Sequence, residues 1–240
     1  MLKAFTVLCL SVLSLAAEEA KRPIWVAAVG DPPVAKLKVV EEYGFRGYKP
    51  EEIDPKLQFP RQWSLSAGGA SESLELKLNH PAIRLDLPAS ATSLELGLEG
   101  EATLTHFQLT SRPTLIVIYN PASDKSWRKG VEALAIPLED RSGSALETTL
   151  LNLAPVSLHY LGSSGKPATL ASHKWIPAKV PREKGSQVAS LPILAKVEKR
   201  EVRLVVTDYR GVSSWKPVTV ITPVFNAARP RLRSSVLYLQ

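Results

Sequence analysis

The stretch SLELKLNHPAIRLDLPASATSLELGL (73–98) alternates apolar and polar residues and is interrupted by turn-forming residues around Pro81 and Pro88. Successive side chains of a strand point to opposite faces, so each alternating segment would have one apolar and one wet face. A helix would need apolar spacings of three and four, which this stretch does not offer. The pattern therefore predicts three short strands, at 74–78, 83–87 and 94–98.

Two later segments, Leu115–Tyr119 and Leu204–Val206, are apolar without alternation, which predicts strands buried on both faces. Other short β-type segments are separated by turn signals, and no long amphipathic helix is visible. The fold class predicted is an all-β, antiparallel β-sandwich. Its further strands are expected at Glu132–Ile136, Leu146–Leu153, Val156–Leu161, His173–Ile176, Val188–Val197, Pro217–Thr222 and Ser235–Leu239.

A faint internal echo suggests two similar halves. TLIVIYNPASDKSWRK (114–129) and RLVVTDYRGVSSWKP (203–217) share an apolar strand, a tyrosine, a polar turn and Ser-Trp before a basic residue. Such an echo is expected where a strand–turn–strand unit is repeated. We therefore predict a sandwich region at 61–240 with an internal division near 122–130.

The N-terminus has the layout of a signal peptide. In MLKAFTVLCLSVLSLAA (1–17), Lys3 precedes a short apolar run, and Ser14 and Ala16 fit a cleavage site after Ala16. Residues 18–60 are rich in proline and charge, which predicts an extended arm or linker with short strands at Ile24–Val29 and Lys36–Val40. The aromatic residues of this arm, Trp25, Tyr43, Phe45, Tyr48 and Phe59, suggest that it lies against the main domain.

Export has chemical consequences. The only cysteine, Cys9, and the only methionine, Met1, would leave with the signal peptide. The mature chain would then form no disulfide and offer no thiolate nucleophile or blue-copper site. No later apolar stretch approaches the roughly 20 residues of a membrane helix, so none is expected after cleavage. The predicted location is the periplasm or the outside of the cell, in association with the envelope.

The sequence offers no recognisable reaction chemistry. Gly162-Ser163-Ser164-Gly165 lacks the spacing of a nucleophile elbow, and the four histidines are isolated from one another. The acidic residues of the alternating strands fit solvent-facing positions. No catalytic, metal-binding or cofactor-binding residue and no cofactor is therefore predicted.

Aromatic residues beside basic ones are the remaining candidates for binding. Trp127-Arg128 and Trp215-Lys216 each follow a turn and place an indole next to a positive charge. Such pairs can stack on a ligand or form an exposed binding patch. The alternative is that the indoles pack in the core at strand ends, with their N–H groups bonded to loop carbonyls.

Parts of the C-terminal half resemble a group of uncharacterised exported proteins from planctomycete and verrucomicrobial-type bacteria. The matching residues are Tyr119-Asn120-Pro121, Asn152-Leu153-Ala154-Pro155-Val156 with Gly162, and Tyr238. Ala154 departs from the serine common at that position. The resemblance spans residues 115–240 and implies an exported β-sandwich with no established activity and no site residues.

These observations predict a non-catalytic binding or scaffolding module of the cell envelope. The formal net charge of +7 is compatible with an anionic glycan or envelope surface, and a protein of the envelope is the other expected ligand. Nucleic acid is not an expected partner, and the oligomeric state is left open. The alternatives are a hydrolase of polysaccharide or peptide whose carboxylates converge from separate strands, and a component of a larger secreted assembly.

Overall fold

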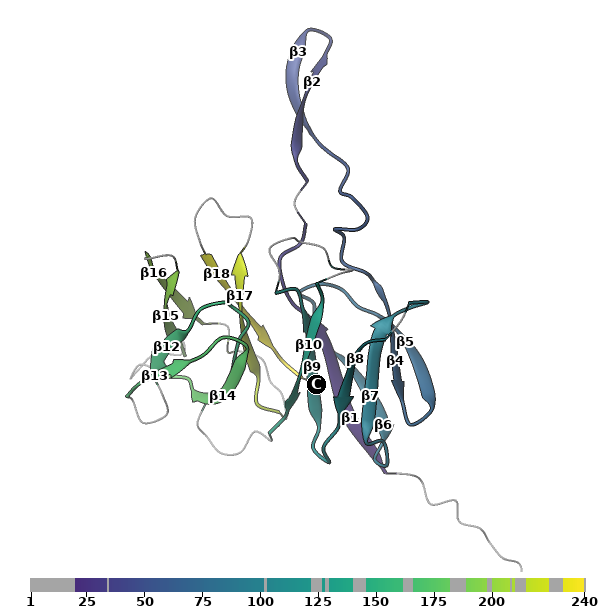
Figure 1. The fold of residues 1–240 in the computed structure, drawn as a ribbon. Coiled ribbons are helices and arrows are strands. Elements are labelled where there is room, and N and C mark those ends of the chain that lie inside the picture. Colours follow the sequence, from purple (N-terminus) through teal and green to yellow (C-terminus); the bar gives the residue numbers. More distant parts are fainter. Residues whose placement is uncertain are drawn as a thin grey trace, which may run out of the picture.

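The computed structural model describes residues 20–33, 35–101, 103–121, 127, 130–139, 146–161, 166–181, 189–197, 200–207, 209, 215–224 and 231–239. Their regular structure is entirely β, with four four-stranded sheets and one two-stranded hairpin. The sheets stack side by side and the hairpin projects away from them (Figure 1). The predicted all-β sandwich architecture is confirmed, whereas the predicted signal peptide lies outside the described residues.

Two sheets form the first sandwich. Sheet I has the order β5-β4-β7-β8, formed by Ala70–Glu75, Gln62–Ala67, Ser93–Leu98 and Thr103–Gln108. Sheet II has the order β10-β9-β1-β6, formed by Glu132–Pro137, Thr114–Tyr119, Lys21–Ala28 and Ile83–Pro88. The alternating stretch that predicted strands supplies β6, β7 and the end of β5, and its leucines are buried between the two sheets.

The second sandwich repeats this arrangement. Sheet III has the order β14-β11-β17-β18, formed by Lys174–Lys179, Glu147–Asn152, Val218–Val224 and Arg231–Leu237. Sheet IV has the order β13-β12-β15-β16, formed by Pro167–Leu170, Leu158–Leu161, Leu191–Val197 and Arg200–Val206.

The two sandwiches have one topology. Taken in chain order without the hairpin, β1 and β4 to β10 occupy the places that β11 to β18 occupy in the second sandwich. Each sandwich also contains one parallel pair, β1 with β9 and β11 with β17, among antiparallel neighbours. The two predicted halves are therefore present, but the echo matched strands that are not equivalent. It aligned β9 with β16, whereas the counterpart of β9 is β17.

Three apolar cores hold the four sheets in the order I–II–III–IV. The first core lies between sheets I and II, the second between II and III, and the third between III and IV. In strand β1, Ile24 and Val26 face the first core, while Trp25 and Ala27 face the second. The central strands of the two inner sheets, β1, β9, β11 and β17, are therefore buried on both faces, which explains their lack of alternation.

The two apolar runs that predict doubly buried strands differ in the structure. Strand β9, Thr114–Tyr119, is buried at every position, as predicted from Leu115–Tyr119. The same prediction for Leu204–Val206 was wrong, because β16 is the edge of an outer sheet and Val205 is 48% exposed. In the second sandwich, β17 is an inner strand, because it lies between β11 and β18 in sheet III.

The predicted arm at 18–60 contains two different structures. Strand β1 lies inside sheet II, between β6 and β9, and so belongs to the first sandwich. Only the part around β2, Leu37–Glu42, and β3, Phe45–Pro50, projects from the body (Figure 1). The chain passes from the first sandwich to the second between Pro137 and Glu147, which is C-terminal to the division expected near 122–130.

Candidate functional site

The hairpin β2–β3 is an insertion between two strands of the first sandwich. Its strands pair from Leu37 opposite Pro50 to Glu42 opposite Phe45, and the amide of Glu51 donates to the carbonyl of Lys36 at 2.6 Å. Tyr43 and Gly44 form the turn with φ values of 53° and 78°. Positive φ at both central residues is typical of the two-residue turns that match strand twist.

One face of the hairpin is apolar. Directly opposed residues of an antiparallel pair share a face, so Leu37 and Val39 lie on the same side as Tyr48. These three side chains are 66%, 52% and 71% exposed, respectively. The hairpin therefore presents a continuous apolar strip to solvent, of the kind that marks an interaction surface.

The tip carries two further exposed aromatic rings. Tyr43 is 100% exposed and Phe45 is 80% exposed. A positive φ is unusual for a bulky residue such as Tyr43 and costs of order 1 kcal/mol or more. Burial therefore does not explain why a tyrosine occupies this turn position, where asparagine or glycine would fit better.

The charges of the hairpin tip compensate one another. Arg46 Nε lies 3.5 Å from Glu41 Oε1, and Lys49 Nζ pairs with Glu42 Oε1. Both pairs are well exposed, so they stabilise the hairpin little. The distal part of the hairpin, Val40 to Gly47, therefore presents its aromatic rings beside two acidic residues and one basic residue, with no excess positive charge.

An aromatic cluster anchors the base of the hairpin. The ring of Phe59 stacks on Trp63 at 5.8 Å and meets Trp127 edge-on at 5.0 Å. Trp63 Nε1 donates to the carbonyl of Pro60 at 2.7 Å. Trp127 is only 2% exposed, so this predicted ligand-binding residue is a core residue in the described structure.

Gly30 packs against the same cluster, where the chain leaves β1. Its φ is +150°, and a Cβ there would lie 3.0 Å from Trp127 Cη2 and Cζ2. The side-chain amide of Asn79 binds both backbone groups of Gly30, at 3.0 Å to its nitrogen and 2.7 Å to its carbonyl oxygen. The backbone at Gly30 is thus held in a conformation that L-residues rarely adopt.

We expect Gly30→Ala to lower the free energy of unfolding by about 1–3 kcal/mol, from backbone strain and overpacking against Trp127. Gly69→Ala is the matched control, because Gly69 has φ +84° and nothing within 4 Å of its Cβ position. That control should show the backbone cost alone, about 1–2 kcal/mol. Urea unfolding measures both variants. If Gly30→Ala lowers the free energy of unfolding no more than Gly69→Ala does, a close contact between residue 30 and Trp127 is contradicted.

Trp215 and Lys216 lie at the junction of the two sandwiches. The ring of Trp215 meets Trp25 edge-on at 5.6 Å, against the second core. Lys216 Nζ lies 2.8 Å from Oε2 of both Glu139 and Glu147, and its side chain is only 12% exposed. Hydrogen bonds to these two carboxylates raise the pKa of Lys216.

The four predicted ligand-binding residues do not form one described surface. Trp127 contacts Phe59 near the hairpin, Trp215 contacts Trp25, and Arg128 lies outside the described residues. The described contacts of Lys216 are with carboxylates of its own chain. Two carboxylates do converge here, but both bind the same ammonium group, which neutralises part of their charge.

Reasoning from the sequence placed Tyr43, Phe45 and Tyr48 against the main domain, and the structure exposes all three. A local signal for the hairpin does exist, since a two-residue Tyr-Gly turn separates two segments rich in valine and aromatic residues. Whether such a hairpin packs or projects depends on tertiary contacts that local sequence does not encode.

The described residues contain no group of three or more histidine, cysteine or acidic residues that could hold a metal ion. Across the same part of the chain, no helix has the length and apolarity needed to cross a membrane. A scan against protein-family models and a search of curated proteins find no match to this chain. The surface of the described residues is therefore the remaining indication of what this protein binds.

Proposed function

We propose that this protein is an exported, non-catalytic binding module that holds a partner protein through the tip of the hairpin β2–β3. The observation that carries the proposal is Tyr43, which is 100% exposed in a left-handed backbone conformation. A side chain in that position adds little to the fold and costs conformational energy. Strained residues with no structural reason are commonly found at functional sites, which supports a role in binding.

The chemistry of the tip favours a protein over an anionic glycan or surface. Between Val40 and Gly47 the two acidic residues Glu41 and Glu42 outnumber the one basic residue, Arg46, so the tip has no excess positive charge to attract an anion. Tyrosine is among the residues that contribute most at protein interfaces, where it fills desolvated pockets. The proposed partner therefore offers a concave, largely apolar site that receives Tyr43 and Phe45.

The four-layer body would support this role as a rigid base. Residues 29–36 lead to the hairpin from β1, which is buried on both faces, and the chain returns through the cluster of Phe59, Trp63 and Trp127. A binding element held by such a base loses less conformational freedom when it binds. This geometry is compatible with a scaffolding module, in which the hairpin would be the recognition element.

We expect the double variant Tyr43→Ser with Phe45→Ser to bind the partner at least about tenfold more weakly, because two interface aromatics are lost. The partner is first captured from envelope extract on the full chain, then purified and titrated by biolayer interferometry. The variant should unfold at the same urea concentration as the wild type, since both side chains are exposed.

The matched control is Leu104→Ser with Val205→Ser, which removes two apolar side chains that are 39% and 48% exposed on the two outer sheets. The control should keep full affinity. Equal affinity of the tip variant and the wild type for the purified partner would overturn the proposal, as would equal losses in both double variants.

A further inference from the structure

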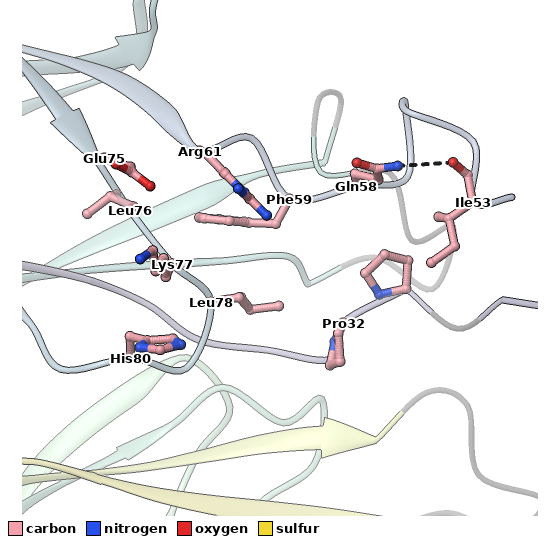
Figure 2. A pocket seen from close by; sticks show the side chains of 11 residues that line it. Pro32, Ile53, Gln58, Phe59, Arg61, Glu75, Leu76, Lys77, Leu78 and His80 are labelled. Atoms are coloured by element: carbon pink, nitrogen blue, oxygen red, sulfur yellow. Dashed lines mark hydrogen bonds between the residues drawn. The ribbon is translucent and has the colours of Figure 1, made fainter.

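A pocket of about 670 Å³ opens at the base of the hairpin. It lies between the segments that enter and leave the hairpin on one side and the end of strand β5 on the other (Figure 2). Its size falls within the range of about 300–1,000 Å³ common for ligand pockets. The pocket is separate from the hairpin tip, and its residues differ from those of the proposed hairpin interface.

Three basic side chains line the pocket. Arg61 precedes β4, while Lys77 and His80 follow β5, and the register of these antiparallel strands brings them together. Figure 2 shows Lys77 and His80 on the segment that follows β5, and Arg61 on the neighbouring segment that leads into β4. Within the described part of the chain none of them forms an ion pair, and Glu75 is the one acidic residue of the lining. The wall therefore carries excess positive charge.

Apart from Gln58, whose side-chain amide donates to the carbonyl of Ile53 at 3.1 Å, the opposite side and floor of the pocket are apolar. Pro32 and Ile53 face the basic wall, and Phe59 and Leu78 lie between them (Figure 2). A free inorganic anion would use only the basic wall, and a sugar acid would leave much of the apolar surface without a matching group. A carboxylate next to apolar side chains would use both sides of the pocket.

Two further hollows adjoin the pocket through shared lining residues. One of about 270 Å³ shares Glu75, Leu76, Lys77 and His80 with it, and another of about 340 Å³ shares His80 and reaches Ser235–Tyr238 of the second sandwich. His80 thus lines all three hollows, which together are called the groove below. A ligand that follows neighbouring hollows would be an extended chain rather than a compact molecule.

We infer that this groove binds an extended, acidic peptide segment, with a glutamate or aspartate side chain at Arg61 and Lys77. Arginine suits this role because its planar guanidinium can bind a carboxylate through two parallel hydrogen bonds. The apolar residues of the segment would pack on Pro32, Ile53 and Phe59. The inference depends on the proposed function only in that the ligand is part of a protein.

The test uses the full chain and a defined probe, the acetylated and amidated peptide (Glu-Leu-Pro)₄, titrated by isothermal calorimetry. The Arg61→Gln and Lys77→Gln double variant is expected to bind this probe at least about tenfold more weakly, because two charge-assisted hydrogen bonds are lost. Binding to the wild type should weaken as salt rises to about 0.5 M, where exposed charges are screened. The probe (Gln-Leu-Pro)₄ should not bind.

Arg200→Gln with Arg203→Gln is the matched control, since it removes two exposed positive charges from β16 in sheet IV. This control should leave peptide affinity unchanged. If both double variants weaken peptide binding equally, net charge alone explains the effect and the inference is overturned. Failure of (Glu-Leu-Pro)₄ to bind at millimolar concentration would also overturn it. So would binding of polygalacturonate or inorganic phosphate in place of the peptide.

The tip variant separates this inference from the proposed function. Tyr43→Ser with Phe45→Ser should bind (Glu-Leu-Pro)₄ as the wild type does, because the pocket lining contains neither residue. Loss of peptide binding in the tip variant would contradict a separate site. A tip variant that keeps the wild-type affinity for both the partner and the peptide would overturn the hairpin proposal alone.

Discussion

Trp25→Ala is expected to lower the free energy of unfolding by about 3–5 kcal/mol, the range found for large buried aromatics replaced by alanine. Trp25 is 1% exposed and lies in the middle of β1, facing the second core. Its ring contacts Trp215 at 5.6 Å and lies under the guanidinium of Arg84 at 5.8 Å. The substitution would leave a cavity between the two sandwiches.

Urea unfolding, followed by far-ultraviolet circular dichroism, measures this loss. Trp175→Ala is the control, because Trp175 lies on the edge strand β14 and is 39% exposed. The control should cost far less than Trp25→Ala. A similar loss in both variants would contradict the view that the second core contributes strongly to stability.

The second core is also expected to make the two sandwiches unfold cooperatively. It joins residues of β1 and β9 to residues of β11 and β17, so neither sandwich can lose its inner sheet without exposing apolar surface of the other. A single unfolding transition in the wild type is the consequence, because shared buried surface couples the two halves. Two sandwiches joined only by a linker would unfold independently.

The sequence predicted the outer layers better than the inner ones. In an outer sheet, one face meets water, so leucines and charges alternate as they do at 94–98. Inner strands have no wet face, and their apolar runs look alike whatever their place in the sheet. For this reason the sequence of Leu204–Val206 predicts an inner strand, although β16 is an edge strand. The sequence around β1 predicts an extended arm because it is rich in proline.

The candidate site was harder to predict, for a physical reason. Tryptophans beside basic residues can serve either binding or packing, and Trp127 is buried against Phe59 and Gly30. The pairing of β4 with β5 brings Arg61 close to Lys77 and His80 in the pocket wall. No local sequence motif predicts this pairing. The turn at Tyr43-Gly44 is a local signal, but Tyr43 is exposed because no described element packs over it.

Stability is expected to fall as the pH rises from 10 to 12, with Tyr209 as a major cause. Thr148 donates to the carbonyl of Pro217 at 2.8 Å, so its 2.7 Å contact with Thr219 requires Thr219 to donate. The hydroxyl of Tyr209, 2.9 Å from Thr219, must then donate in turn. Burial raises the pKa of Tyr209 from the usual tyrosine value of about 10 to about 12.

Below pH 10 the folded and unfolded chains both keep the Tyr209 proton. Between pH 10 and about 12 the unfolded chain loses this proton while the folded chain retains it, so stability falls with each unit of pH. A shift of this size corresponds to roughly 2–3 kcal/mol. Burial also raises the pKa of Tyr119 and Tyr160, and both act in the same direction.

Tyr209→Phe isolates this contribution. At pH 8 the variant should be less stable than the wild type by about 1 kcal/mol, because the hydrogen bond to Thr219 is lost. By pH 12 the wild type should lose roughly 2–3 kcal/mol through Tyr209, which exceeds its advantage of about 1 kcal/mol at pH 8, so the two stability curves should cross between pH 10 and 12. Urea unfolding at half-unit intervals of pH measures both curves, and parallel curves would show that Tyr209 titrates normally in the folded protein.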